Sequence, residues 1–385
     1  MIHKYPGKRE HPLHPPRDYY SMAQEGPIAR AELADGRQVW LVTRYAEARQ
    51  VLEDTRFSSD ATRPGFPVRR SPSALIRNDP PQHTHLRKFL ANEFRGRAVA
   101  DLEPEIAEIV RDLGGKMAQS EEVEFMSAFA LPLPSTVICR LLAVPDGDHI
   151  ALQEMGARTL SATASDAEVD AAVEELGDYM RGIVARELAQ PSDSMVGRLA
   201  RSSKEYGISG ETLADLCRLL LVAGHVTTVN AIGIGLYSLL RQRQQWQLLS
   251  AEPSRVGRAV DELLRFLTVA QTLSRVATQD LEIAGVRIKE GDGVMVLLTV
   301  ANRDERVFDR PNVLDISRPR GSHLAFGYGP HLCLGAALAR LEMKEAFRYL
   351  SQEFPDVSLA ADGDELNYRT NVLIYGVHEL PLRLR

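Results

Sequence analysis

The sequence predicts a mainly α-helical protein with a smaller β-rich part, on three observations. Apolar residues recur with helical spacing, interrupted by short breaks, across Ala98–Ala200. A longer helical pattern follows over roughly Ser209–Arg241, and the strong helix formers past Gly335 predict another helix near the end of the chain. Strand-like patterns are short, and two of them, Leu281–Ile288 and Gly293–Val300, are separated by a turn-forming run.

Composition describes an ordinary globular protein with an ample core. The chain has 385 residues, of which 44% are hydrophobic and 25% are charged. Because no flexible linker, charge block or internal repeat divides it, we expect a single domain over residues 1–385. A formal net charge of −6 argues against general nucleic-acid binding.

The N-terminus and the cysteines indicate the cellular compartment. The first ten residues contain no apolar stretch of the kind found in a signal peptide or a membrane anchor. The three cysteines, Cys139, Cys217 and Cys333, are odd in number and far apart. This pattern is typical of a reducing environment, so we expect a cytoplasmic protein without membrane association.

The first part of the chain predicts a strand, a helix and an irregular loop. Arg37–Thr43 alternates like a strand, and Tyr45–Leu52 follows as a short helix. The segment Ser58–Asn78 is rich in Ser, Pro and Arg and shows no periodicity. Its arginines are Arg63, Arg69, Arg70 and Arg77. Such charges are usually solvated, and the alternative is an anionic substrate or an acidic carrier protein that presents one.

A short segment that begins at Asp79 places two basic residues on one helix face. Pro80 and Pro81 suit a first helical turn, and His83 and Arg87 then lie four residues apart. A histidine and an arginine so placed could hold a carboxylate, since Arg binds carboxylates through two parallel hydrogen bonds. Taken alone, such a pair is more often part of a solvated surface.

The predicted long helix carries an unusual cluster of small and hydroxyl-bearing residues. Gly224 costs about 1 kcal/mol in a helix interior relative to Ala. The adjacent Thr227 and Thr228 can hydrogen-bond to preceding carbonyls and open the helix locally. The alternative is a close crossing of two helices packed through small residues.

The segment Phe326–Arg340 is the most informative in the chain. It places Cys333 just before a helix, where unpaired N–H groups favour a thiolate, which is a soft metal ligand. The small or rigid residues around it are Gly327, Gly329, Pro330 and Gly335. A buried structural cysteine is the alternative, but it leaves these residues and His331 unexplained. Zinc would need a second ligand at suitable spacing, and an iron–sulfur cluster would need four cysteines.

These residues resemble the haem-binding signature of the cytochrome P450 family. Phe326, Gly329, Cys333 and Gly335 match it, with His331 between them. The resemblance implies that Cys333 is the thiolate ligand of a haem iron and that His331 meets a haem propionate. Phe326, Gly327 and Gly335 then belong to the cofactor-binding loop.

Other segments match the same family. By resemblance, His83 and Arg87 hold haem propionates, and Arg275 binds the other propionate. Ala223, Gly224 and Thr227 match the family's oxygen-activating motif, which implies that Thr227, with Thr228 beside it, helps to deliver protons. The acidic residue of that motif is missing, because its position holds Val226.

A further match concerns folding rather than chemistry. Glu262 and Arg265 lie three apart on a predicted helix and can pair. With Arg318 they resemble the family's Glu/Arg/Arg network, which braces the haem loop.

The resemblance implies a mainly helical P450 fold around one haem b and a monooxygenase that inserts one oxygen atom from dioxygen into a small organic substrate, expected to be a secondary metabolite. Electrons are expected ultimately from NAD(P)H through a separate ferredoxin and ferredoxin reductase, because no reductase follows Arg385. Two alternatives stay open. Val226 raises oxidative coupling or nitrogen oxidation on the same scaffold. A haem-binding sensor or catalytically idle partner protein is the other, and the presence of Thr227 argues against it.

Two surfaces are expected to contact other molecules. The residues expected to line a mostly apolar substrate pocket are Leu219, Ala223, Val269, Ala270, Gln271, Val372 and Leu373. The basic residues expected to receive an acidic ferredoxin on the thiolate side are Arg87, Lys88, Arg95 and Arg97.

Overall fold

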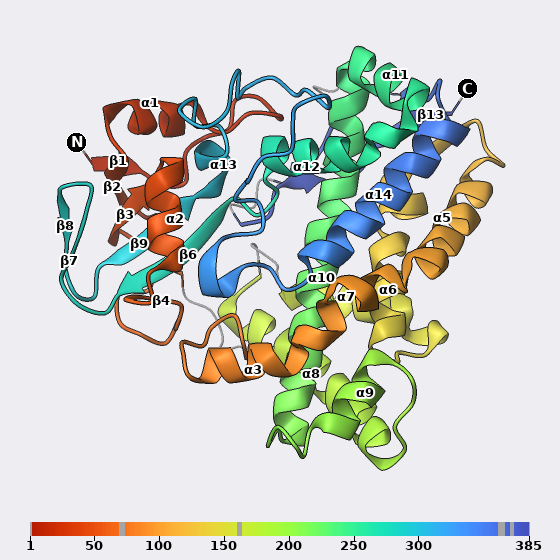
Figure 1. The fold of residues 1–385 in the computed structure, drawn as a ribbon, viewed down its shortest axis with the longest axis horizontal. Coiled ribbons are helices and arrows are strands. Elements are labelled where there is room, and N and C mark those ends of the chain that lie inside the picture. The colour runs from red at the N-terminus through yellow and green to blue at the C-terminus, as the bar shows by residue number, and fades with distance from the viewer. Residues whose placement is uncertain (1, 69–73, 160–163, 361–365, 370–372, 385) are drawn as a thin grey trace.

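The computed structural model describes residues 2–68, 74–159, 164–360, 366–369 and 373–384. Helices fill the larger part of the molecule, and a strand-rich part lies at one side, on the left of Figure 1. The predicted class, mainly α with a smaller β-rich part, is confirmed. Arg69, Arg70 and Val372 lie outside the described residues.

The helices follow the chain from its N-terminal to its C-terminal part. The α-helices are α1 (Arg17–Glu25), α2 (Tyr45–Glu53), α3 (Gln82–Leu90), α4 (Gly96–Ala100), α5 (Glu103–Met117), α6 (Pro132–Leu141), α7 (His149–Thr159), α8 (Asp166–Ala189), α9 (Met195–Ser202), α10 (Gly210–Arg241), α11 (Arg243–Ala251), α12 (Val256–Leu267), α13 (Leu298–Ala301) and α14 (Ala336–Glu353). Single turns of other helix types are η1 (Ala91–Phe94), η2 (Met126–Ala130), η3 (Asp146–Asp148), η4 (Pro253–Arg255) and η5 (Gly329–His331).

The described strands form one large sheet and three small ones. The strands are β1 (Ile2–Lys4), β2 (Ile28–Glu32), β3 (Gln38–Val42), β4 (Phe57–Ser58), β5 (Glu122–Glu124), β6 (Thr272–Ala277), β7 (Leu281–Ile283), β8 (Val286–Ile288), β9 (Gly293–Leu297), β10 (Ser358–Leu359), β11 (Tyr368–Arg369), β12 (Gly376–Val377) and β13 (Pro381–Arg383). The large sheet has the order β1-β2-β3-β9-β6-β4, and the small sheets are β10-β13-β5, β11-β12 and β7-β8.

The large sheet is apolar on both faces, because alternate residues of its central strands enter two different clusters. Val39 and Leu41 of β3 pack with α1, whereas Val42 of the same strand packs with Tyr45 of α2. A strand turns successive side chains to opposite faces, so the two helices cover the two sides of the sheet. This arrangement holds β6 and β9 rigidly beside the helical part.

Helix α10 runs through the middle of the helical part, with α14 crossing in front of it in Figure 1. The hydroxyl of Ser209 caps its start by accepting the N–H of Thr212 at 3.1 Å, as the sequence favours. By length and composition this helix could cross a membrane, but 72% of its apolar window is buried inside the protein. That burial is the ordinary property of a core helix.

Three local predictions were wrong in detail. Leu281–Ile288 is a hairpin of β7 and β8 that turns at Ala284 and Gly285, both with positive φ, and not one strand. The next predicted strand ends at Leu297, where α13 begins. Within the region predicted to be helical, Glu122–Glu124 forms β5, because it pairs with β13 from the far end of the chain. Sequence periodicity cannot detect such a distant partner.

Candidate active site

The segment before α14 forms a tight loop that brings Phe326 and Cys333 together. The N–H of Cys333 donates to the carbonyl of Phe326 at 2.8 Å. Gly327 and Gly329 adopt φ values of 73° and 70°, which L side chains rarely tolerate. At Gly329 a Cβ would also lie 2.6 Å from the carbonyl oxygen of Leu52 in α2. The glycines predicted from the sequence are therefore required by backbone shape and by the contact with α2.

Cys333 differs from the other two cysteines, because its side chain is exposed whereas Cys139 and Cys217 are buried. The surrounding protein still desolvates the sulfur, and this raises the pKa of the Cys333 thiol. The N–H of Gly335 and the guanidinium groups of Arg87 and Arg340 act in the opposite direction. The expected thiolate-favouring groups are thus present, but desolvation outweighs them until a metal displaces the proton.

Four basic side chains from separate parts of the chain converge beside this loop. His83 comes from α3, Arg275 from β6 and His331 from η5, and the rings of His83 and His331 have centroids 3.9 Å apart. Arg87, one turn after His83, donates from Nη2 to the carbonyl of Leu332 at 2.6 Å. Burial lowers the pKa of His331 to about 3, and the neighbouring Arg275 lowers it further.

This basic cluster lacks anions of its own. Neither ring nitrogen of His83 has a hydrogen-bond partner among the described residues. Arg275 is 5% exposed, and burial lowers its pKa to about 10. The nearby carboxylate, Asp79, accepts hydrogen bonds from the hydroxyl of Ser58 and the N–H of Ser59. Buried cationic groups without counter-charges are costly, so the cluster fits a ligand that carries more than one carboxylate.

An accessible stripe interrupts the otherwise buried surface of α10. Ala223 is exposed, and Leu219 and Thr227 are partly exposed at four-residue spacing on either side of it. The hydroxyl of Thr227 donates to the carbonyl of Ala223 at 2.9 Å. Thr228 is 3% exposed and lies off this stripe. The structure therefore places Thr227 and Ala223, but not Thr228, on the accessible side of the helix.

The expected local opening of α10 is wrong, because the helix is continuous from Gly210 to Arg241. Gly224 instead faces α6, where a Cβ would meet Ile138 Cδ1 at 3.6 Å. This is ordinary van der Waals contact, so the helix crossing weighed as an alternative accounts for the position of Gly224.

The two residues that follow Gly224 are buried. His225 is 6% exposed, its Nε2 has no partner among the described residues, and burial together with Arg369 lowers its pKa to about 4. Val226 is 7% exposed. His225 is therefore neutral near pH 7.

The predicted ion network behind the loop is confirmed. Arg265 binds Glu262 through two hydrogen bonds of 2.8 Å, and Nε of Arg318 binds the same carboxylate at 3.0 Å. Glu262 also accepts the N–H of Asp315 at 3.1 Å. Both oxygens of this buried carboxylate are thus satisfied, and the network ties α12 to the segment that leads into the cysteine loop.

Two polar residues beside the site were missed by the sequence interpretation. The hydroxyl of Ser59 lies 3.2 Å from Nε2 of His331. Nη2 of Arg9, in the N-terminal segment, donates to Oε1 of Gln271 at 2.8 Å. A single Ser or Arg without a motif gives no local signal, since only the folded chain brings these partners together.

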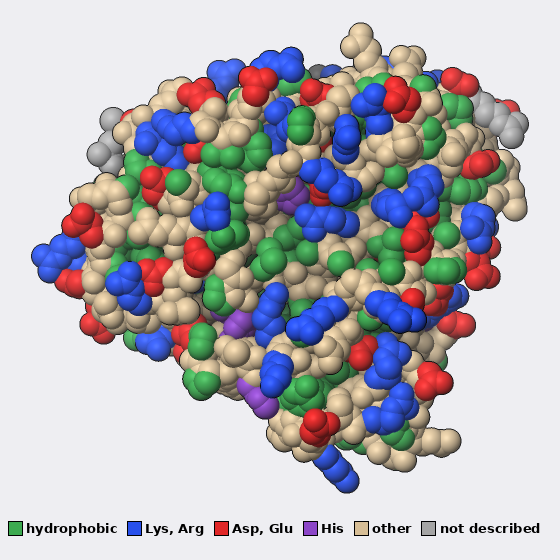
Figure 2. Space-filling view, viewed as in Figure 1, with side chains coloured by type: hydrophobic (Ala, Val, Ile, Leu, Met, Phe, Trp, Pro, Cys, Tyr) green, Lys and Arg blue, Asp and Glu red, His purple; other side chains and the backbone are tan. Residues whose placement is uncertain are grey.

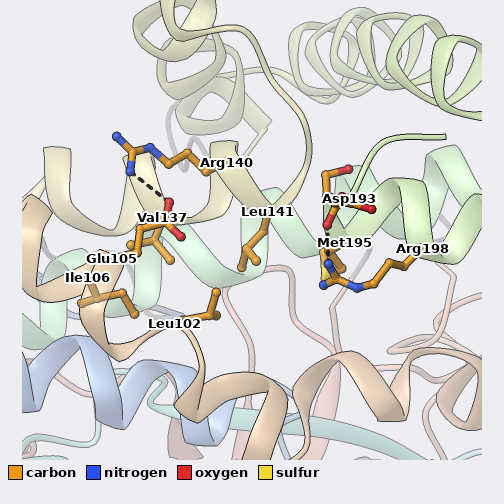
Figure 3. A pocket seen from close by; sticks show the side chains of 10 residues that line it. Leu102, Glu105, Ile106, Val137, Arg140, Leu141, Asp193, Met195 and Arg198 are labelled. Atoms are coloured by element: carbon orange, nitrogen blue, oxygen red, sulfur yellow. Dashed lines mark hydrogen bonds and ion pairs between the residues drawn. The ribbon is translucent and has the colours of Figure 1, made fainter. Parts of the chain in front are cut away.

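A separate cavity of about 160 Å³ lies between α5, α6 and the start of α9 (Figure 3). Its floor is apolar, and an ion pair of 2.9 Å between Arg140 and Glu105 crosses its rim. None of the predicted site residues lines it. The cysteine loop and the stripe on α10 therefore mark the candidate site, and this cavity does not.

Comparison with known proteins identifies the family. A family model described as cytochrome P450 matches residues 185–378, which include the stripe on α10, Arg275 and the whole cysteine loop. Pentalenic acid synthase of Streptomyces avermitilis is 41% identical over 98% of this chain and 96% of its own length. The chain belongs to the cytochrome P450 family. It is thus an oxidoreductase of the monooxygenase type, and haem iron is the cofactor that the family implies.

Other relatives cover the chain as fully. Nocardicin C N-oxygenase of Nocardia uniformis is 35% identical over 96% of this P450 and 95% of its own length. The crystal structure of CYP105P1 in complex with filipin I superposes with a TM-score of 0.95 at 33% identity, covering 100% of this chain and 99% of that one. The predicted P450 fold is therefore confirmed over the whole chain.

The residues present fit a haem. An accessible sulfur, a cluster of unpaired basic groups and an accessible stripe on α10 correspond to an iron, two propionates and the opposite face of a flat macrocycle. Gly335 adds to this fit, because a Cβ there would meet nothing within 4 Å.

Proposed function

We propose that this P450 is a haem-thiolate monooxygenase that inserts one oxygen atom into a small organic secondary metabolite. The observation that carries the proposal is the position of Cys333, exposed at the end of a closed loop beside four basic side chains without counter-charges. When bound, haem b supplies the activation of dioxygen, and thiolate ligation favours cleavage of the O–O bond.

The basic cluster would hold the propionates of that haem. Arg87 and Arg275 supply fixed charges, and Arg can bind a carboxylate through two hydrogen bonds. His83 and His331 are neutral near pH 7 while the cluster lacks an anion, because burial and the two arginines disfavour their protonated forms. A propionate beside them would accept a hydrogen bond and restore their affinity for protons. Phe326, Gly327 and Gly335 would line the cofactor on the thiolate side, with Ala223 and Gly224 on the other.

Thr227 is the residue of α10 best placed to move a proton toward the reacting oxygen. Its hydroxyl lies on the accessible stripe and already donates to Ala223, so it can accept a hydrogen bond from water or substrate at the same time. Val226 cannot carry a proton, and the neighbouring His225 is buried. We therefore assign proton delivery to Thr227 with ordered water, and Thr228 a supporting place in the helix.

Electrons would reach the site through a ferredoxin and its reductase, ultimately from NAD(P)H. Lys and Arg side chains gather over the middle of the face shown in Figure 2, above α3 and the start of α14. Lys88, Arg95 and Arg97 are exposed there, and Leu332, next to Cys333, is 44% exposed. An apolar contact ringed by positive charge suits an acidic electron carrier. The net charge of −6 does not oppose this, because steering depends on the local potential.

Substrate class and setting follow from the relatives and from the chain together. Named relatives make pentalenic acid or oxidise nocardicin C, and a solved structure holds filipin I, so we propose a secondary-metabolite substrate for this P450 as well. Residues 1–385 would act as one cytoplasmic domain. Nitrogen oxidation is the second candidate, favoured by the N-oxygenase among the relatives and by Val226.

Spectroscopy and turnover test the proposal. The purified protein should bind one haem, and its reduced carbon monoxide complex should show the red-shifted Soret band of thiolate ligation. With a surrogate ferredoxin system, a ligand that raises the spin state should increase reductant consumption and give an oxygenated product. A histidine-type spectrum would contradict the cofactor assignment, and consumption indifferent to every ligand would favour an idle haem protein.

A further inference from the structure

The N-terminal segment lies against the part of the P450 that leads into β6. The hydroxyl of Tyr5 contacts Oγ1 of Thr272 at 3.4 Å, and Nη2 of Arg9 donates to Oε1 of Gln271 at 2.8 Å. The Arg9 guanidinium also lies 3.8 Å from the ring centroid of Tyr375, and its Nη1 donates to the carbonyl of His14. Arg9 therefore joins three distant segments.

Gln271 occupies a fixed backbone position beside the candidate site. Its N–H donates to the carbonyl of Leu373, and its own carbonyl accepts the N–H of Leu298, both at 3.0 Å. It precedes Leu273 and Arg275 at two-residue spacing, so the three share one side of the strand path. Leu273 approaches the cysteine loop at Gly327, and Arg275 belongs to the basic cluster. Gln271 thus points to the side of β6 that faces the site.

Arg9 fixes which end of the Gln271 amide faces inward. Amide oxygen and nitrogen are easily confused, but a guanidinium only donates hydrogen bonds, so the oxygen must face Arg9. The Nε2 group then points away from Arg9, and it has no hydrogen-bond partner among the described residues. Since Gln271 is only 8% exposed, this free donor is a property of the interior and not of the outer surface.

The charge of Arg9 acts in the same direction. Among the described residues Arg9 has no carboxylate within ion-pairing distance, and its hydrogen bonds go to neutral oxygens. A positive charge behind the amide polarises it and strengthens the donor on its far side. The pair thus presents a donor that favours an electron-rich partner.

We propose that Arg9 is a positioning residue that holds Gln271 as a hydrogen-bond donor to an acceptor oxygen of the substrate, a carbonyl or carboxylate. The inference rests on the proposed function, since it names the chemistry that this same site would recognise. In an otherwise apolar pocket one oriented donor selects the position of the substrate, because a buried donor left unpaired loses binding free energy.

Azole ligands that coordinate haem iron supply a probe that does not depend on knowing the substrate. The probes are 4-phenylimidazole and its ortho-, meta- and para-acetyl derivatives, titrated by the Soret shift of the holoenzyme. In wild type at least one acetyl isomer should bind more tightly than the parent. That advantage should fall roughly threefold to tenfold in Gln271→Leu, the range expected for one hydrogen bond.

Variants of Arg9 separate positioning from a merely structural role. Arg9→Lys keeps a residue that only donates and should retain the acetyl advantage. Arg9→Glu offers an acceptor, so the Gln271 amide should turn over and the advantage should disappear while binding of the parent azole stays unchanged. Arg9→Glu combined with Gln271→Leu should lose no more than either change alone. Arg17→Met, at an exposed arginine paired with Glu10, is the matched control and should behave as wild type.

The outcomes distinguish this inference from the function on which it rests. If the parent azole shifts the Soret band but no acetyl isomer differs between wild type and Gln271→Leu, the inference is overturned and the haem site stands. If Arg9→Glu weakens parent and acetyl azoles equally, Arg9 is structural only, and the inference is likewise overturned. If no azole shifts the band, the proposed function itself fails and the inference fails with it.

Discussion

The imidazole rings of His83 and His331 lie with centroids 3.9 Å apart, although one comes from α3 and the other from the cysteine loop. Both have lowered pKa values, first because they are desolvated and then because of neighbouring basic groups. Four basic side chains are thus assembled at one point before any anion is bound. A site built in this way is less stable empty than filled, which gives the first prediction.

Arg275→Met should affect the empty and the loaded protein in opposite directions. Without haem, the change removes a buried cation that lacks a counter-charge, so the free energy of unfolding should rise by about 1–3 kcal/mol. With haem, it removes a propionate partner, and haem affinity should fall roughly tenfold to a hundredfold. Urea unfolding of the haem-free protein and haem transfer to apomyoglobin measure the two effects. A loss of stability in both forms would mean that Arg275 is a structural residue.

Cys333→Ser should abolish thiolate ligation without unfolding the chain. The side chain is exposed and the substitution keeps its size, so circular dichroism should change little. The reduced carbon monoxide complex should lose its red-shifted Soret band. Cys139→Ala and Cys217→Ala are the controls, because burial raises the pKa of both thiols to about 12 and keeps them unreactive. Loss of the band in either control would redirect the ligand assignment.

Thr227→Ala should waste reductant as peroxide, because the hydroxyl on the accessible stripe would no longer hold water at the reacting oxygen. Product formed per reductant consumed should fall roughly tenfold, a typical contribution of one positioned proton donor. Thr228→Ala, which alters a buried side chain off the stripe, should reduce coupling less. Val226→Glu, which restores an acid, should keep or improve coupling. If Thr227→Ala leaves coupling intact, the hydroxyl is structural and nitrogen oxidation or oxidative coupling becomes the better hypothesis.

Charge reversal on the surface around Leu332 should slow electron transfer. Arg95→Glu with Arg97→Glu should lower the rate of reduction by ferredoxin roughly tenfold at low salt, because steering between opposite charges speeds encounter. Raised ionic strength should slow the wild type as well. Lys289→Glu, on the exposed β7–β8 hairpin at the far side of the sheet, should leave the rate unchanged. Stopped-flow rates indifferent to both reversal and salt would remove this docking surface.

His225→Gln should make folding less sensitive to acid. The pKa of His225 is about 4 in the folded protein and near 6.5 once unfolded, so the unfolded chain binds the proton first as pH falls. The stability tied to neutral His225 is present above pH 6.5 and is lost as pH falls towards 4. Between pH 7.5 and 5 the wild type should lose about 2 kcal/mol more than the variant, as measured by urea unfolding. Equal losses would show that His225 is solvated in the folded state.

Local sequence determined the elements whose signals lie within a few residues. The start of α10 at Gly210 follows from its capping serine, and α2 and α14 follow from periodicity and helix propensity. The positive φ of Gly327 and Gly329 was signalled by the glycines themselves. The family resemblance located Cys333 and the basic residues because the spacing of such motifs is itself local.

Tertiary structure alone decided everything that depends on distant partners. No local pattern marks β5 as a strand, because its partner β13 is at the other end of the chain. Gly224 suggested a locally opened helix, but packing of Ile138 accounts for it in a continuous one. Arg9 carries no motif, and its link to Gln271 exists only because β1 and β6 join one sheet. Spacing along the chain fixes which residues can do the chemistry, whereas burial and the loss of solvent, which need the whole fold, set their pKa values and hydrogen-bond directions.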